Sequence, residues 1–234
     1  MKYKLISELF IFLSFIVLLA ACSGKEEMQV KIANPTAFDR TSEMVEIPYS
    51  ELSDKLNLET RQQFVIVDSF MEQVPFQILK YGSDSARSVI FPVTLKAESS
   101  IVYTIKKGIP EIFPAEVFGR LVPERKDDFA WENNRIAFRM YGPALETTGE
   151  ISNGIDVWVK STGNLIIDKW YKNDLAGIAF YHEDHGEGLD CYKVGRTLGA
   201  GAAAPFVNDT LWLGNNFVSY KILDSGPLRL TRIL

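Results

Sequence analysis

The chain has 234 residues and a formal net charge of −5, which counts against nucleic acid as a partner because nucleic-acid binding depends on basic surface. Hydrophobic residues make up 47% of the chain, so it can bury the core of one large domain or two small ones. The acidic balance leaves small ligands open, since an acidic protein can still carry a local basic pocket.

The first residues resemble a bacterial lipoprotein signal. Lys2 and Lys4 give a positively charged start, and the apolar run Leu9–Ala21 is too short for a comfortable membrane span. The run ends at Cys22, where the cysteine of such a signal is lipidated and becomes the new N-terminus. We therefore expect residues 1–22 to be a lipoprotein signal peptide, and the lipid anchor to be the only contact with the membrane.

Lipidation of Cys22 leaves Cys191 as the single remaining cysteine, so no internal disulfide is expected. We expect Cys191 to be a small buried residue rather than a nucleophile. We also expect Trp158, Trp170 and Trp212 to lie in the core.

The body of the chain reads as mainly β, because short runs rich in Val, Ile, Phe and Thr are separated by turn-forming residues. The predicted strands are 63–70, 74–81, 88–97, 101–106, 135–141, 156–160, 217–223 and 228–233. Residues 49–58 and 166–174 could each form a short helix. The spacing of about 8–12 residues between the early strands predicts a β-sandwich.

The residue composition changes after Gly108, where prolines interrupt the pattern of β-forming residues. This change predicts a domain boundary near 108–118. We expect an N-terminal β-rich subdomain over 28–108, and the start of a second β-sandwich, carrying the site, over 118–234. Only seven residues follow a predicted turn that ends at Pro227. A sandwich that stops there would expose a strand edge, so we expect a C-terminally truncated fold.

A polar cluster occupies residues 123–135. Such a run of charges is typical of a solvated loop, and binding is the alternative. Trp131 offers a flat apolar face for a sugar ring. The cations could hold a carboxylate and the acids and amide could bind hydroxyls. The cations are Arg125, Lys126 and Arg135, and the hydroxyl binders are Asp128, Glu132 and Asn133.

Both histidines of the chain lie three residues apart in the segment 181–192, among acids and glycines. Histidine changes its protonation most readily near neutral pH, and the glycines favour a loop. His182 and His185 are therefore candidate proton acceptors. Tyr181 and Tyr192 frame the loop and are candidate proton donors.

A divalent metal is the less favoured interpretation of the same loop, and no cofactor is expected. Imidazole and carboxylate groups suit zinc, manganese or calcium. The weak candidate ligands are His182, His185, Glu187 and Asp190. Their spacing is not that of the tight zinc motifs.

Three runs resemble a family of secreted proteins long described as a domain of unknown function. They are Val122–Asn133, Ile136–Leu145, and Tyr181–Cys191 followed by Leu198–Gly201. The family is typical of polysaccharide-utilisation loci in Gram-negative bacteria and includes an ulvan oligosaccharide dehydratase. The resemblance implies a galactose-mutarotase-like β-sandwich (supersandwich), and a lipoprotein on the periplasmic side or at the cell surface of the outer membrane. The family domain continues beyond the end of this chain, which puts the activity of this shorter product in question.

The resemblance implies a carbon–oxygen lyase that acts on uronate-containing oligosaccharides. Removing water, or a sugar, from a uronate requires a base, an acid and a cation that holds the developing charge. His182 or His185 could be the base, Tyr181 or Tyr192 the acid, and Arg125 or Arg135 the cation. The alternative is a non-catalytic lipoprotein that binds the same acidic oligosaccharides through the same polar groups.

Overall fold

The computed structural model describes residues 26–59, 63–150 and 152–234. The predicted mainly β class is confirmed: strands account for 40% and helices for 12% of the chain. The predicted signal peptide, 1–22, lies outside the described residues. Within the described ranges, no helix is both long enough and apolar enough to cross a membrane.

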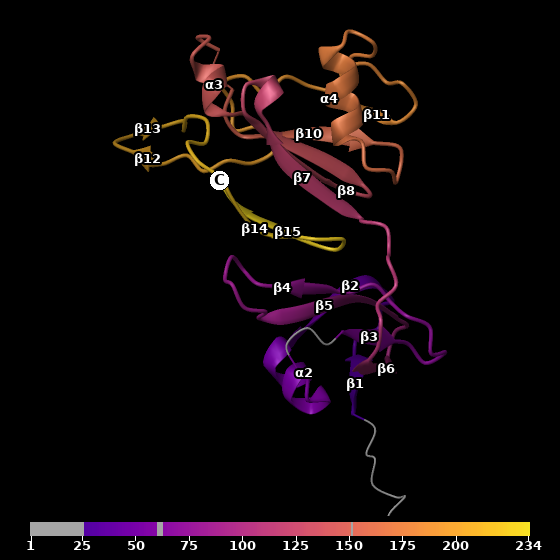
Figure 1. The fold of residues 1–234 in the computed structure, drawn as a ribbon. Coiled ribbons are helices and arrows are strands. Elements are labelled where there is room, and N and C mark those ends of the chain that lie inside the picture. Colours follow the sequence, from indigo (N-terminus) through magenta and orange to yellow (C-terminus); the bar gives the residue numbers. More distant parts are fainter. Residues whose placement is uncertain (1–25, 60–62, 151) are drawn as a thin grey trace, which may run out of the picture.

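The N-terminal part consists of two antiparallel three-stranded sheets whose inner faces share one core (Figure 1). One sheet has the order β1 (Glu27–Asn34), β6 (Ser99–Lys107), β3 (Phe64–Val67), and the other has β2 (Arg40–Pro48), β5 (Ser88–Leu95), β4 (Gln77–Leu79). Helix α2 (Tyr49–Leu56) adds Leu52 and Leu56 to this core. Apolar residues alternate along β6, which gives this strand one buried face.

The second part is built on a five-stranded antiparallel sheet with the order β11-β10-β9-β8-β7. These strands are β7 (Val117–Val122), β8 (Asp128–Asn133), β9 (Ile136–Met140), β10 (Ile155–Lys160) and β11 (Gly188–Asp190). The 3₁₀ turn η1 (Pro123–Arg125) joins β7 to β8, and the short helix α3 (Pro143–Glu146) follows β9. Helix α4 (Ile167–Leu175) packs over one face of the sheet, where Trp158, Trp170 and Tyr171 are buried.

A C-terminal hairpin, β14 (Lys221–Ser225) and β15 (Leu230–Ile233), lies between the two parts (Figure 1). Gln77 of β4 accepts hydrogen bonds from the backbone N–H groups of Leu228 and Arg229 and donates one to the carbonyl of Arg229. On the other side, Arg232 stacks over the Trp131 ring of β8, 3.4 Å from its centre. The division into 28–108 and 118–234 stays a prediction, and the hairpin makes contacts on both sides of it.

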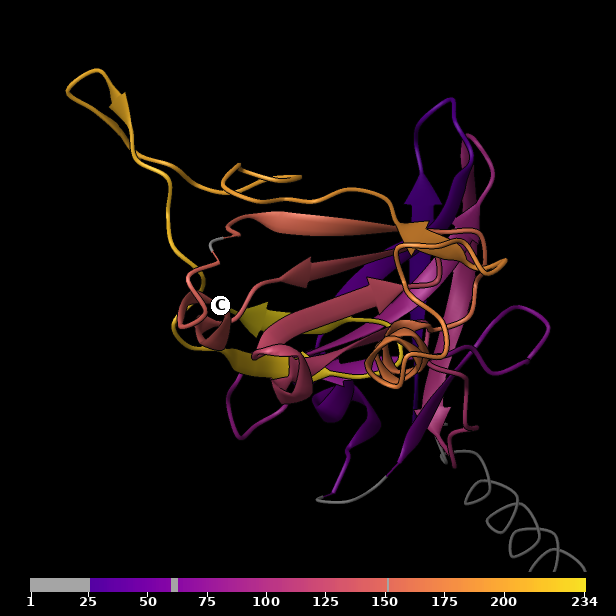
Figure 2. The ribbon, with the colours of Figure 1, turned by 90° about the horizontal axis from the view of Figure 1, so that it is seen from above.

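A second hairpin, β12 (Phe206–Val207) and β13 (Thr210–Leu211), extends away from the body of the molecule (Figure 2). Trp212, just after β13, is 61% exposed, so the expectation that it lies in the core is wrong. Trp158 and Trp170 are buried, as expected. Cys191 is exposed rather than buried, because it follows the last residue of the edge strand β11.

Candidate functional site

The centre of the site is Arg139, a buried residue of β9. Its Nε and Nη2 atoms donate to Oδ2 of Asp156, at 2.9 and 2.5 Å. Nη2 also donates to Oδ2 of Asp190 at 2.9 Å, and Nη1 donates to the hydroxyl of Tyr181 at 3.1 Å. The guanidinium also lies 4.8 Å from the ring centre of Tyr141, close enough for a cation–π contact. Arg139 therefore joins three segments of the chain in one network.

Strand register places these groups together. Arg139 is directly opposite Asp156 on β10 and Ala130 on β8, and Asp190 is opposite Trp158, two residues along β10 from Asp156. Alternate residues of a strand share a face, so Asp128 points to the same side as Ala130 and approaches Arg139. Its Oδ2 atom lies 3.7 Å from Nη1 of Arg139.

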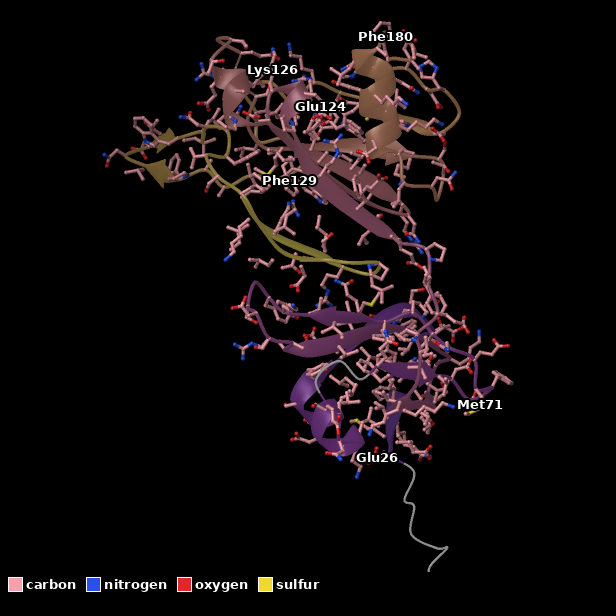
Figure 3. The ribbon with its side chains drawn as sticks, viewed as in Figure 1. Glu26, Met71, Glu124, Lys126, Phe129 and Phe180 are labelled. Atoms are coloured by element: carbon pink, nitrogen blue, oxygen red, sulfur yellow. The ribbon has the colours of Figure 1, made fainter. Side chains whose placement is uncertain are left out.

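The polar motif and the histidine loop meet here through Arg125 and Asp128. Arg125 Nη1 lies 3.9 Å from Oδ2 of Asp128. Burial acts to lower the pKa of Arg125, but the charge of Asp128 and then the Tyr181 hydroxyl raise it above its usual value. Tyr171 of α4 donates its hydroxyl hydrogen to Asp128 at 3.3 Å. Figure 3 shows Glu124 and Lys126, on either side of Arg125, on the α4 side of the sheet.

Burial dominates the electrostatics of the site. It raises the pKa of Asp128 to about 6 even though Arg139 and Arg125 act to lower it. It likewise raises the pKa of Asp190 to about 6, against the effect of Arg139 and with a contribution from the charge of Asp156. Three carboxyl groups thus face two guanidinium groups, and carboxyl groups in this pKa range can exchange protons near neutral pH.

Four buried atoms of this cluster make no hydrogen bond within the described residues. They are Nη1 of Arg125 and Oδ1 of Asp128, Asp156 and Asp190. Leaving a buried polar atom unsatisfied costs about 1–3 kcal/mol, so these atoms favour any group that hydrogen-bonds to them. They combine one donor with three acceptors, which a buried water molecule or a ligand hydroxyl can satisfy.

His182 lies at the surface of this cluster. Its Nδ1 atom is 3.2 Å from the carbonyl oxygen of Asp190 and 3.4 Å from Oδ2 of the same residue. The His182 side chain is 58% exposed, and its ring centre lies 4.7 Å from that of Tyr181. Because Asp190 holds Nδ1, the arrangement leaves Nε2 as the nitrogen that can exchange a proton with a ligand.

His185 has a different environment. Its Nε2 atom contacts the carbonyl of Phe180 at 3.2 Å, and its ring lines a cavity of about 50 Å³ beside α4. A water molecule takes about 30 Å³ in the liquid, so this cavity has room for water but not for a sugar ring. Tyr192 donates its hydroxyl hydrogen to the carbonyl of Ile155 at 3.1 Å.

Four of the predicted binding residues lie apart from the Arg139 cluster. Trp131 points to the opposite face of the sheet, where Arg232 and Phe138 cover its ring. Phe129, two residues earlier, lies on the same hairpin-facing side in Figure 3. Glu132 shares the Asp128 face, but it bonds to the start of α4 and to Lys160. Asn133 and Arg135 form the exposed turn between β8 and β9, where the Asn133 side chain accepts the Arg135 N–H.

The four weak metal candidates have separate surroundings. Glu187 pairs with Lys169 at 2.8 Å, whereas Asp190 faces Arg139 and the two histidines contact different backbone carbonyls. Over the described ranges, no group of three or more His, Cys, Asp or Glu side chains is placed to hold a metal ion.

Four members of the network escaped prediction: Arg139, Tyr141, Asp156 and Tyr171. Arg139 and Asp156 each stand in a strand that alternates apolar and polar residues, and such polar residues usually face solvent. The available signal was Ala137 on the same face as Arg139. A small residue beside a long charged one favours a buried face, because a large neighbour would leave no room for the arginine.

Comparison with known proteins gives three findings. The profile of a family described as Domain of unknown function (DUF4861) matches residues 32–234. A relative from Formosa agariphila, named Uncharacterized protein P7, is 32% identical over 237 residues. That alignment covers 95% of this chain and 60% of P7, so the chain spans about 60% of the length of this relative. An alpha-mannosidase from Enterococcus faecalis V583 gives a TM-score of 0.35 and 14% identity, over 59% of this chain and 17% of the mannosidase.

Proposed function

This chain belongs to the DUF4861 family, and from the geometry of its histidine loop we propose that it eliminates water or a sugar from uronate-containing oligosaccharides. The observation that carries the proposal is the placement of His182. Asp190 holds its Nδ1 atom, Nε2 is left for a ligand, and Arg125, which interacts with Tyr181, has a buried Nη1 atom that makes no hydrogen bond within the described residues.

The proposed chemistry uses these groups in order. The uronate carboxylate binds Arg125, where two-pronged contact with a guanidinium is favourable. His182 Nε2 takes the proton from the carbon next to the carboxylate, and Asp190 stabilises the imidazolium that forms. The electron pair of the broken C–H bond forms a C=C bond as the neighbouring C–O bond breaks. The departing oxygen takes a proton from the Tyr181 hydroxyl and leaves as water or as a sugar hydroxyl.

A glycan-binding lipoprotein without catalysis is the second candidate. The cavity beside His185 holds only about 50 Å³, and Tyr181, the proposed acid, is 95% buried with its hydroxyl bonded to Arg139. These features favour a rigid binding surface over a deep catalytic pocket. In this case, Arg125 and His182 would hold the acidic sugar at the surface.

The test compares His182→Gln with His185→Gln in the purified protein. The substrate is an oligosaccharide that ends in a uronate, and the product is followed by ultraviolet absorbance of the new C=C bond and by mass. An amide keeps hydrogen bonding but takes no proton near neutral pH. We expect His182→Gln to lower kcat by about 10²-fold or more, the scale for losing a general base, with little change in KM.

His185→Gln is the matched control, because the same change is made three residues away in the same loop. It should retain most of the activity. Equal and normal turnover in both variants would exclude histidine as the base. If the unmodified protein binds the oligosaccharide but forms no product, the binding function replaces the catalytic one.

A further inference from the structure

A groove of about 390 Å³ lies where the N-terminal sandwich meets the C-terminal hairpin. It is distinct from the Arg139 cluster, since none of its lining residues belongs to the five-stranded sheet. Tyr49, Phe76 and Ile78 come from the sandwich, and Ser225 and Pro227 come from the turn of the hairpin. Ligand pockets in proteins typically measure about 300–1,000 Å³, so the groove is large enough for a small ligand.

Aromatic rings form one wall of the groove. The rings of Phe64 and Phe76 stack with centres 4.6 Å apart, and the Tyr49 ring lies tilted 6.5 Å from Phe64. Phe64 is buried, so its packing fixes the orientation of the two partly exposed rings beside it. A wall of this kind offers flat apolar surface with little freedom to move, which lowers the entropy cost of binding.

Uncharged polar groups lie along the same groove. The Tyr49 hydroxyl, the Gln63 amide and the Ser225 hydroxyl make no hydrogen bond with any other described residue. No charged side chain is among the described residues that line the groove. The lining therefore matches a neutral ligand that combines apolar C–H surface with hydroxyl groups.

We propose that this groove is a second carbohydrate-binding site, which holds a neutral pyranose ring against Tyr49 and Phe76 and bonds its hydroxyls through Tyr49, Gln63 and Ser225. A pyranose presents C–H groups on one face and hydroxyls at its edge, and this is the pattern of the lining. The choice of a glycan over other amphipathic ligands rests on the proposed function. The two sites would then take different units, the acidic unit at Arg125 and a neutral unit here.

The walls of the groove are held in place before any ligand binds. Gln77 makes three hydrogen bonds to Leu228 and Arg229, and the carbonyl of Pro227 accepts the N–H of Glu116. Gly226 fits because a Cβ atom there would come within 2.4 Å of the Gln77 side chain. The turn therefore approaches β4 closely, and its position relative to Tyr49 is fixed.

The test is saturation-transfer NMR with the methyl glycosides of xylose, rhamnose and galactose as probes, and with the methyl glycoside of glucuronic acid as the charged comparison. Transfer to the ring C–H protons of at least one neutral glycoside is expected. The double variant Tyr49→Phe/Gln63→Ala removes two hydrogen-bonding groups and keeps the aromatic wall. It should weaken binding of that glycoside roughly tenfold.

Tyr220→Phe/Gln29→Ala makes the same chemical changes at exposed positions outside the groove and should leave the binding unchanged. The proposal is overturned if no neutral glycoside shows transfer, if both double variants behave alike, or if a proline-rich peptide binds the groove in place of the sugars. Elimination activity separates the two proposals: groove variants that lose neutral-sugar binding should still turn over a short uronate substrate, whereas His182→Gln should still bind the neutral glycoside.

Discussion

Asp128 shows how a single buried carboxyl group couples the site to the stability of the protein. Its side chain is fully buried, and desolvation outweighs the two nearby arginines, so its pKa rises from 3.8 to about 6. A raised pKa means that the folded state favours the protonated form. The corresponding stabilisation is complete below pH 4 and is lost as the pH rises through 6.

We therefore expect the free energy of unfolding to fall by about 2–3 kcal/mol from this residue between pH 4 and pH 7, since one pKa unit corresponds to about 1.4 kcal/mol. Asp128→Asn cannot titrate and should lack this component. The measurement is urea unfolding of both proteins across this pH range. The quantity of interest is how their difference changes with pH, because the variant also alters the packing around Arg139.

Asp184→Asn provides a control with the opposite sign. Backbone N–H groups of Gly186 and Gly188 bond to the Asp184 carboxylate and lower its pKa. The wild type should then gain stability relative to this variant as the pH rises towards 4, and the difference between the two should change little from pH 4 to pH 7, where the Asp128 effect appears. A difference between wild type and Asp128→Asn that stays constant from pH 4 to pH 7 would contradict the assignment.

At the scale of single residues, the sequence was a better guide to the loop than to the strands. The sequence singles out the two histidines and Tyr181 because the chain has no other histidine, and Arg125 because it lies in a run of mixed charges. The structure brings Tyr181, His182 and Arg125 together. Arg139 and Asp156 did not stand out, since alternation tells which residues share a face but not which face is buried. Only the cover supplied by distant segments, here α4 and the histidine loop, decides that question.

At the scale of elements, the start of helix α4 depends on a side chain from strand β8. The backbone N–H groups of Ile166 and Ile167 at its start donate to the Glu132 carboxylate of β8, each at 2.8 Å to Oε1. The negative charge also suits the positive end of the helix dipole. Lys160 lies 2.7 Å from the same carboxylate, and both side chains are fully buried. Glu132 thus has structural partners for both its oxygens.

Glu132→Ala should destabilise the protein by about 3–5 kcal/mol, because it leaves the buried Lys160 charge without its carboxylate partner. Chemical denaturation measures the loss. Arg135→Ala, at the exposed end of the same hairpin, is the control and should change stability by less than about 0.5 kcal/mol. If Glu132 instead serves to bind substrate hydroxyls, its removal would raise KM and leave the unfolding curve where it was.

Strand and helix positions were predicted well where hydrophobic patterns were strong. The prediction over 88–97 matches β5 (Ser88–Leu95), and the helix over 166–174 matches α4 (Ile167–Leu175). The run of charges is typical of a solvated loop, yet Asp128–Asn133 is strand β8, in which Asp128 and Glu132 are buried. The strand is difficult to predict because Asp128 and Glu132 are charged. The residues that pair with them in the core, Arg139 and Lys160, come from other strands.

For the whole molecule, we expect attachment to a membrane through Cys22. Cys22→Ser should abolish the incorporation of a labelled fatty acid supplied to growing cells, because the lipid is joined to this side chain. Cys191→Ser is the matched control, since it removes the other cysteine, which is exposed, and should leave the labelling unchanged. Labelled protein in the Cys22→Ser variant would exclude lipidation at this position.

The hairpin bonds of Gln77 have a consequence for the route by which the chain folds. They join positions 151 and 152 residues apart, and contacts of such long range form late because the intervening loop must first be closed. The strands between residues 27 and 107 pair among themselves and can collapse earlier. Until Leu228 docks, Met44, Leu79 and Ile90 of that early-formed unit lack their apolar cover. We therefore expect docking of the hairpin to be the step at which productive folding competes with aggregation.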